Sequence, residues 1–176
     1  MTIRKALARS VALAGIVLAG STALPGPASA QIYMTPDDHL AIERRLGRDL
    51  ARCIDDGRGS YEGVLACGRS VADTCYAMSP HGETTAGFAI CGQITAGLLD
   101  AEMNRVWSAI KAEFPPDAFA RRLEEQRAWL KFRESEFWAA RERYRGGSMS
   151  QYSGWVEYNS LSVDRLARLH EIAGDR

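Results

Sequence analysis

Apolar residues recur every three or four positions through most of the chain, and this spacing predicts helices. The first helix is expected between Thr35 and Gly57. Thr35 suits the cap, Pro36 suits the first helical position, and Gly57 suits the end. A shorter helix is expected to follow, capped by Ser60. No segment alternates apolar and polar residues over a useful length, so the pattern predicts an all-α fold.

Three longer helices are predicted in the second half of the chain. They span about residues 85–113, 117–144 and 151–173, and Pro115 and Pro116 separate the first two. The glycine- and serine-rich stretch at 146–154 is the most loop-like part of this half. We therefore predict a small bundle of about four to five helices, three of them long and antiparallel.

The first thirty residues have the pattern of a signal peptide. A basic start, "MTIRKALAR", precedes an apolar run, "SVALAGIVLAG", which is too short to span a bilayer. The sequence "ASA" before Gln31 is a typical cleavage site. Ser21 stands where a lipoprotein signal would need cysteine. Residues 1–30 are thus predicted to be removed, leaving an exported protein, periplasmic or secreted, with no membrane anchor.

The remaining 146 residues, 31–176, suit a single helical domain with its own core. The predicted leader holds three basic residues and no acidic ones, which leaves 19 basic and 22 acidic residues and a net charge of −3. This charge gives no reason to expect binding to nucleic acid. It is compatible with a basic protein partner. The sequence does not indicate the oligomeric state.

All four cysteines follow the predicted leader: Cys53, Cys67, Cys75 and Cys91. An even number in an exported protein predicts two disulfides, and the wide gaps disfavour a zinc site, which usually contains a C-x2-C pair. Three pairings are possible. We favour the sequential pairs Cys53–Cys67 and Cys75–Cys91. Each closes a loop of about 15 residues, which contributes about 3 kcal/mol in the chain-entropy model.

Polar residues interrupt the apolar faces of the three long helices. Gln126 and Arg133 lie within the apolar face of helix 117–144, with Trp129 at its edge, and Arg165 lies within that of the last helix. A buried amide or charge without a partner costs several kcal/mol. Such side chains should therefore find one another.

The partners expected for these residues come from helix 85–113, where Asp100 and Asn104 share a face. We predict that Asp100 or another acid pairs with Arg133, that Asn104 pairs with Gln126, and that Arg165 lies nearby. Together with Trp129, these residues form what we call the polar clasp. The alternative is that the same side chains line a ligand cleft, but helix faces in a small bundle usually form core.

The spacing of Gln126, Trp129 and Arg133 resembles the Q-x-x-W-x-x-x-R signature of the lysozyme-inhibitor LprI-like family. The resemblance extends over about residues 60–172, through further elements that occur in the family's order. These are the cysteine-bearing segment with Cys67, Cys75 and Cys91, a D-x-x-L-N-x-x-Y element at Asp100, Met103, Asn104 and Trp107, the "GGS" turn at 146–148, and a T-x-x-R-x-x-x-L ending at Ser162, Arg165 and Leu169.

The resemblance implies a small, helical, exported bacterial protein, and the family's named member inhibits lysozyme. Many relatives carry cysteines near Phe137 and near Glu157, which implies a disulfide across the glycine turn. Both cysteines are absent here. The turn is then expected to be held only by packing, through residues such as Phe137, Trp138 and Trp155.

Motifs for catalysis are absent from the sequence. His39, His81 and His170 form no H-E-x-x-H motif, and "GGSMS" is not a nucleophile elbow. No glycine-rich loop is placed to bind phosphate. The sequence therefore predicts a protein that is not an enzyme and has no cofactor, no metal and no catalytic residues.

The resemblance predicts an exported envelope protein that inhibits a lysozyme-type glycosidase by protein–protein binding. Such an enzyme works with two carboxylates in a cleft, which a donor-rich loop could block. The expected loop residues are Arg145, Gly146, Gly147, Ser148 and Ser150. An alternative is a periplasmic interaction or stress-response module without lysozyme activity, which would use exposed aromatic residues. A small-ligand binder that uses the polar clasp is a third reading.

Overall fold

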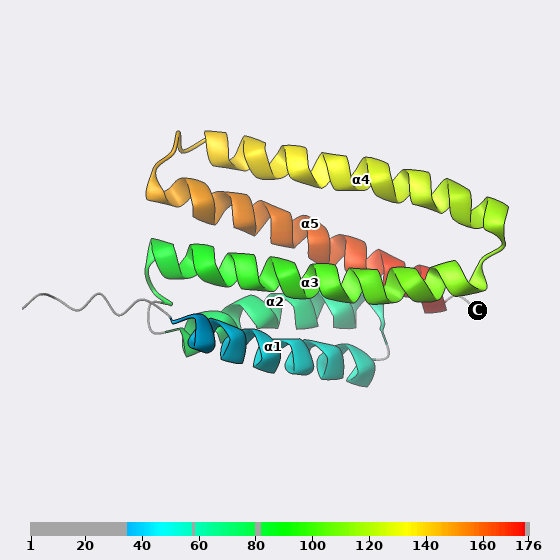
Figure 1. Ribbon diagram of the computed structural model, residues 1–176, viewed down its shortest axis with the longest axis horizontal. Helices are drawn as coiled ribbons and strands as arrows, with labels where there is room; N and C mark the ends of the chain where they lie inside the picture. The colour runs from blue at the N-terminus through cyan, green and yellow to red at the C-terminus, as the bar shows by residue number, and fades with distance from the viewer. Residues whose placement is uncertain (1–34, 58, 80–81, 175–176) are drawn as a thin grey trace, which may run out of the picture. The chain divides into compact units, whose positions relative to one another are not determined.

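The computed structural model describes residues 35–57, 59–79 and 82–174, which form five α-helices (Figure 1). These are α1 (Pro36–Asp56), α2 (Tyr61–Met78), α3 (Thr85–Glu113), α4 (Pro116–Glu142) and α5 (Ser148–Gly174). These ranges contain no strand, and the predicted all-α fold is confirmed. The predicted leader, residues 1–30, lies outside the described residues. In the part that is described, no helix is both long and apolar enough to cross a membrane.

Side-chain hydroxyls cap the N-termini of the first three helices, as their sequences favour. The backbone N–H of Asp38 donates to Thr35 Oγ1 (3.1 Å), and Asp38 returns the contact in a capping box. Ser60 Oγ accepts from the N–H of Gly63 (3.3 Å), and Thr84 caps α3 in the same way. The α4 helix has proline in its first turn instead of a side-chain cap. These local contacts explain why most helix boundaries were predictable.

The start of α5 differs from the expectation. The helix begins at Ser148, three residues before the predicted start, so the loop between α4 and α5 is shorter than the stretch 146–154 suggested. The hydroxyls of Ser150 and Ser153 donate to the carbonyls of Arg141 (3.1 Å) and Ala140 (2.7 Å). Because these bonds satisfy carbonyls at the end of α4, they hold the first turn of α5 against that helix.

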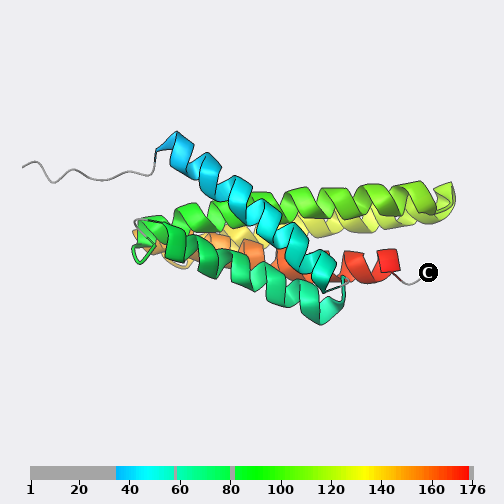
Figure 2. The ribbon, with the colours of Figure 1, turned by 90° about the horizontal axis from the view of Figure 1, so that it is seen from below.

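The three long helices lie side by side with α5 in the middle (Figure 1). Successive long helices run in opposite directions, so α3 and α5 run the same way. Gly92 accordingly meets Trp155 near the start of both helices, and Glu102 meets His170 further along. The α4 helix packs on α5 and makes little contact with α3. Seen from below, α1 crosses the other helices obliquely (Figure 2).

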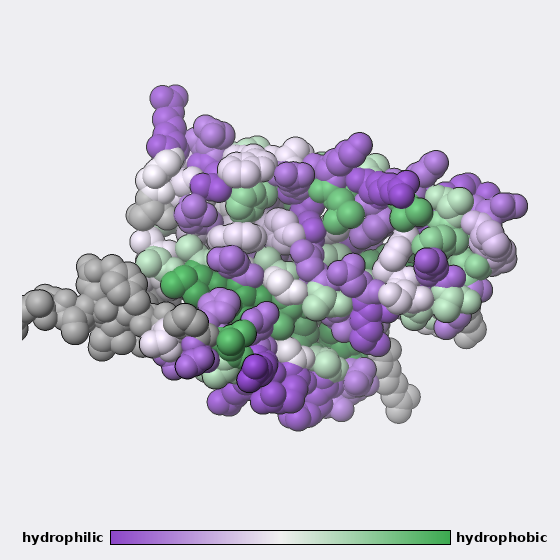
Figure 3. Space-filling view, in the orientation of Figure 1, coloured by the Kyte–Doolittle hydropathy of each residue, from purple (hydrophilic) through white to green (hydrophobic). Residues whose placement is uncertain are grey.

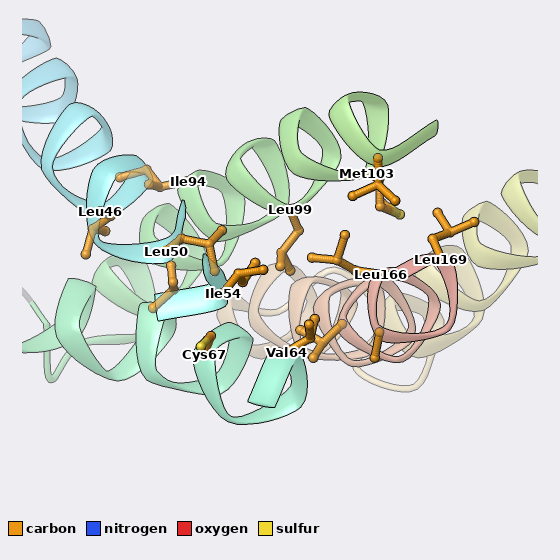
Figure 4. Packing of buried hydrophobic residues seen from close by; sticks show 14 of the residues in the cluster. Leu46, Leu50, Ile54, Val64, Cys67, Ile94, Leu99, Met103, Leu166 and Leu169 are labelled. Carbon is orange, nitrogen blue, oxygen red and sulfur yellow. The ribbon is translucent and has the colours of Figure 1, made fainter. Parts of the chain in front are cut away.

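The hydrophobic core lies between α1, α2, α3 and α5 (Figure 4). The largest apolar side chains that are almost fully buried are Leu46, Ile54, Leu99, Ile110, Leu166 and Leu169. The α4 helix adds only partly buried residues, Phe119 and Trp129, to this cluster. The position of α4 therefore depends on contacts other than the main core. Hydrophobic residues also show on the surface between α1 and α3, whereas hydrophilic residues cover the outer side of α1 (Figure 3).

Two disulfides join the first three helices. Cys53–Cys67 links α1 to α2, with Cα atoms 5.8 Å apart, and Cys75–Cys91 links α2 to α3, with Cα atoms 5.6 Å apart. All four cysteines are thus in the two sequential pairs. The prediction of a small disulfide-stapled helical bundle is confirmed.

Candidate functional site

Arg133 is the centre of the polar contacts between α4 and the rest of the bundle. Its side chain is only 7% exposed, and its Nη1 donates to Asp100 Oδ1 (2.6 Å) and to Ser162 Oγ (2.9 Å). The guanidinium carbon lies 4.0 Å from the ring centre of Tyr158 and 4.8 Å from that of Trp129. One arginine of α4 is therefore bound by a carboxylate of α3, a hydroxyl of α5 and two aromatic rings.

Asp100 joins three helices through its two carboxylate oxygens. Oδ1 accepts from Arg133, and Oδ2 accepts from the hydroxyl of Tyr158 (2.8 Å). Burial raises the pKa of Tyr158, and the hydrogen bond to Asp100 raises it further. The phenol therefore stays protonated and remains a donor at any physiological pH. Asp100 on α3 thus fixes α4 and α5 together.

A second contact of the polar clasp joins Gln126 to Arg165. Arg165 Nε donates to Gln126 Oε1 at 2.8 Å, and its guanidinium carbon lies 5.6 Å from the ring centre of Trp129. The predicted pairing of Gln126 with Asn104 is wrong, because the amide oxygen of Gln126 is turned to α5. Asn104 is exposed and lies with Gln126 on the lining of a cavity of about 410 Å³ between α3 and α4.

The structure thus brings together five of the six predicted clasp residues and leaves out Asn104. It also adds Tyr158 and Ser162, which are not among the predicted clasp residues. Ser162 is fully buried, accepts from Arg133 and donates to the carbonyl of Tyr158 (2.7 Å). Its place in the T-x-x-R-x-x-x-L element was the available signal. Tyr158 gives no such signal, because a tyrosine at helical spacing among apolar residues is common.

The predicted partner loop is a tight turn between α4 and α5. All five residues of 143–147 are exposed. Arg145 and Gly146 have positive φ angles, 42° and 81°, which reverse the chain within a few residues. The N–H of Gly147 donates to the carbonyl of Tyr144 (3.0 Å), which closes the turn. The turn presents Arg143, Tyr144 and Arg145 to solvent.

Ser150 does not belong to this exposed surface, contrary to the prediction. It is 4% exposed, and its hydroxyl donates a hydrogen bond to the carbonyl of Arg141. The backbone of Ser148 begins α5, and its side chain lies outside the described residues. Of the predicted donors, Arg145 is therefore the side chain that the structure leaves accessible. Arg143 and Tyr144 were not predicted as part of the loop.

Aromatic packing holds the base of the turn. The ring of Phe137 lies 4.9 Å from that of Trp155 and 5.2 Å from that of Trp138, measured between centres. Trp138 is 51% exposed, with the guanidinium of Arg141 4.7 Å from its ring centre. These contacts occupy the region where the resemblance implies a disulfide in relatives. The turn is therefore exposed at its tip and held firmly at its base.

Comparison with models of protein families identifies the family of this chain. A family model described as "Lysozyme inhibitor LprI" matches residues 75–169. This chain belongs to the LprI family. Searches of curated proteins and of solved structures each return no match. The LprI match contains every residue of the polar clasp and the whole α4–α5 turn, but it leaves out α1 and most of α2.

The LprI family is named for inhibition, which requires binding of an enzyme rather than catalysis. The described residues contain no group of three or more His, Cys, Asp or Glu side chains arranged to hold a metal ion. Charged groups of the polar clasp form bonds between helices, from Arg133 to Asp100 and from Arg165 to Gln126, although the buried Nε of Arg133 has no partner among the described residues. The accessible chemistry near the LprI signature helix is the basic and aromatic turn at its carboxyl end.

Proposed function

We propose that this protein acts outside the cytoplasm and inhibits a lysozyme-type glycosidase by binding it through the α4–α5 turn. Membership of the LprI family supports the activity. The signal-peptide pattern of residues 1–30 and the two disulfides support an oxidising location, the periplasm or the exterior. The rest of the proposal concerns how the turn would engage the enzyme.

The observation that carries the proposal is the exposed sequence Arg143-Tyr144-Arg145 on a fixed base. Lysozyme-type glycosidases have two carboxylates in their cleft. The planar guanidinium of arginine matches a carboxylate with two parallel hydrogen bonds. Tyrosine adds apolar area and a hydroxyl with few rotatable bonds, which suits a binding hot spot. Because the serine bonds and aromatic packing already order the turn, little entropy is lost on binding.

Charge favours the same partner at longer range. The chain after the predicted leader has a net charge of −3, and lysozymes are often cationic. Opposite net charges speed the encounter between proteins. The turn is locally positive, so it would meet the acidic cleft rather than the basic exterior of such an enzyme.

The test is an assay of cell-wall lysis by lysozyme in the presence of the purified protein. We expect inhibition at micromolar concentration. Replacing both Arg143 and Arg145 with alanine should weaken inhibition at least tenfold, because loss of hot-spot contacts commonly costs about 1–2 kcal/mol or more. The matched control replaces two exposed arginines elsewhere on α4, Arg121 and Arg127, and should inhibit like the parent protein.

Two results would count against parts of the proposal. Undiminished lysis at micromolar protein would contradict inhibition of that lysozyme class and favour a different envelope partner. Full inhibition by the Arg143→Ala, Arg145→Ala variant would retain the activity but remove the turn as its site. Circular dichroism of each variant should show the same helix content, because all four arginines are exposed.

A further inference from the structure

We propose that a cavity between α2, α3 and α5 binds a compact, neutral, mostly apolar molecule that carries a hydroxyl or amide group. The cavity has a volume of about 400 Å³, within the usual range for small-molecule sites. Its described lining comes from these three helices and includes no residue of α4 or of the α4–α5 turn. The site is therefore separate from the surface proposed for lysozyme.

Glycines bring the walls of this cavity together. A Cβ atom at Gly92 of α3 would lie 2.5 Å from Cβ of Trp155, and one at Gly68 of α2 would lie 2.6 Å from Cγ2 of Val163. At these glycines, α2 and α3 therefore lie so close to side chains of α5 that no Cβ atom would fit without a shift. Trp155 and Val163 also line the cavity, so these contacts fix two apolar side chains of its wall.

Two buried polar atoms in the lining have no hydrogen-bond partner among the described residues. They are Oγ1 of Thr95, a residue that is 1% exposed, and Oδ1 of Asn159, and both residues line the cavity. The amide of Asn159 is oriented by its Nδ2, which donates to the carbonyl of Gly92 (2.9 Å). Gly92 lies three residues before Thr95, so Asn159 reaches the same turn of α3 that carries the threonine.

Unpaired buried oxygens are unfavourable, and a ligand that satisfies them would gain affinity. Asn159 Oδ1 only accepts hydrogen bonds, so the ligand must supply a donor. The hydroxyl of Thr95 is able to donate, so the ligand group should also accept. Hydroxyl and primary amide groups meet both requirements with one small polar head.

The rest of the lining favours a neutral ring. Its only charged residues among those described are Arg69 and Asp73, one of each sign and both exposed on successive turns of α2. Their opposite charges give the mouth no net preference for an ion. Phe88, Tyr152 and Trp155 supply aromatic surface, and the rings of Phe88 and Tyr152 are 5.1 Å apart. An aromatic ligand would extend this packing.

Part of this site lies beyond the segment that matches the LprI model. Five α2 residues of the lining, from Leu65 to Asp73, precede Cys75, where the match begins, and the sixth, Tyr76, follows it. The part of α2 outside the match thus completes one wall of the cavity. Binding there does not require lysozyme inhibition, so the two proposals fail independently.

The experiment is a titration of the purified full chain with p-cresol and with toluene, followed by two-dimensional amide NMR. The probes share a ring and differ in one hydroxyl. We expect saturable shifts centred on Thr95 and Asn159, and p-cresol should bind at least fivefold more tightly than toluene. Thr95→Val keeps the shape but removes one polar partner, so it should reduce this preference severalfold while leaving toluene binding unchanged.

A blocking variant gives the second test. Ala72→Phe places a ring in the lining and should abolish saturable binding of both probes. Ala139→Phe adds the same ring on the exposed side of α4 and should bind like the parent chain. The proposal is overturned if p-cresol shows no saturable shifts, or if p-cresol and toluene bind the parent chain equally. Thr95→Val, being isosteric, keeps the proposal testable if Ala72→Phe does not fold.

Discussion

The polar clasp explains why a helix of this bundle buries charged and amide side chains. Four residues of α4 are buried, and two of them are Gln126 and Arg133. Each is bonded to α5, and Arg133 also reaches Asp100 of α3. Because the side chain of Asp100 is 37% exposed, water screens part of the pair. The fully buried contact to Ser162 is the less screened half of the interaction.

Replacing Arg133 with methionine should lower the free energy of unfolding by about 1–3 kcal/mol, since the buried Ser162 and the acceptor Asp100 lose their donor. Thermal or urea unfolding followed by circular dichroism measures this. Arg121→Met on the exposed face of α4 is the matched control and should change stability by less than about 0.5 kcal/mol. Equal melting temperatures for the two variants would show that the clasp does not stabilise the fold.

The spacing of the helices is set by glycines at the contacts with α5. Gly92 of α3 faces Trp155, and Gly154 of α5 faces α4, where a Cβ would lie 2.6 Å from Cγ of Arg141. Gly97, also in α3, has no atom within 4 Å of an added Cβ. Glycine therefore matters for packing at one position of α3 and not at the other. It permits the close approach of α5 at Gly92, whereas Gly97 has no packing role.

Alanine substitutions distinguish these two positions. Gly92→Ala should reduce stability by about 1–3 kcal/mol, because the new methyl group overlaps Trp155. Gly97→Ala should raise it by about 0.5–1 kcal/mol, because alanine restricts the unfolded chain and favours helix. Urea unfolding of both variants measures the difference. A Gly92→Ala variant as stable as Gly97→Ala would contradict the close approach of α3 to α5.

At the scale of the whole molecule, the three helices linked by disulfides, α1 to α3, are joined to α5 by a buried carboxylate as well as by apolar packing. Glu102 of α3 accepts from Arg105 and contacts Nε2 of His170 on α5 (3.2 Å). Burial alone raises the pKa of Glu102, but the hydrogen bonds from His170 and Arg105 outweigh it and lower the pKa from 4.5 to about 2. The ionised carboxylate is thus the form that the folded molecule prefers.

Because of this lowered pKa, the free energy of unfolding of the whole molecule decreases as the pH is lowered. The contribution is present above about pH 4.5 and is lost as the pH falls toward 2, because the unfolded chain takes up the proton first. It amounts to roughly 3 kcal/mol at most. Urea unfolding midpoints measured between pH 6 and pH 2.5 should fall steeply for the parent chain. The fall should be smaller for Glu102→Gln, and parallel curves would contradict the assignment.

The sequence by itself determined the features that depend on neighbouring residues. Helical periodicity, hydroxyl caps and helix-breaking prolines act within a few residues, so the helices from Thr35 to Glu113 were predicted closely. The LprI signature is also local, since Gln126, Trp129 and Arg133 occupy one face of one helix. The buried environment of Arg133 and its acidic partner followed from the cost of an unpaired charge.

Only the tertiary structure decided which surfaces meet. Gln126 pairs with Arg165 rather than Asn104 because α4 packs on α5 and makes little contact with α3. Ser150 is buried because the carbonyl groups at the end of α4 need donors, which no periodicity within α5 reveals. The cavity at Thr95 depends on three helices at once. Contacts between helices arise from the whole chain's packing, and this is why one stretch of sequence does not specify them.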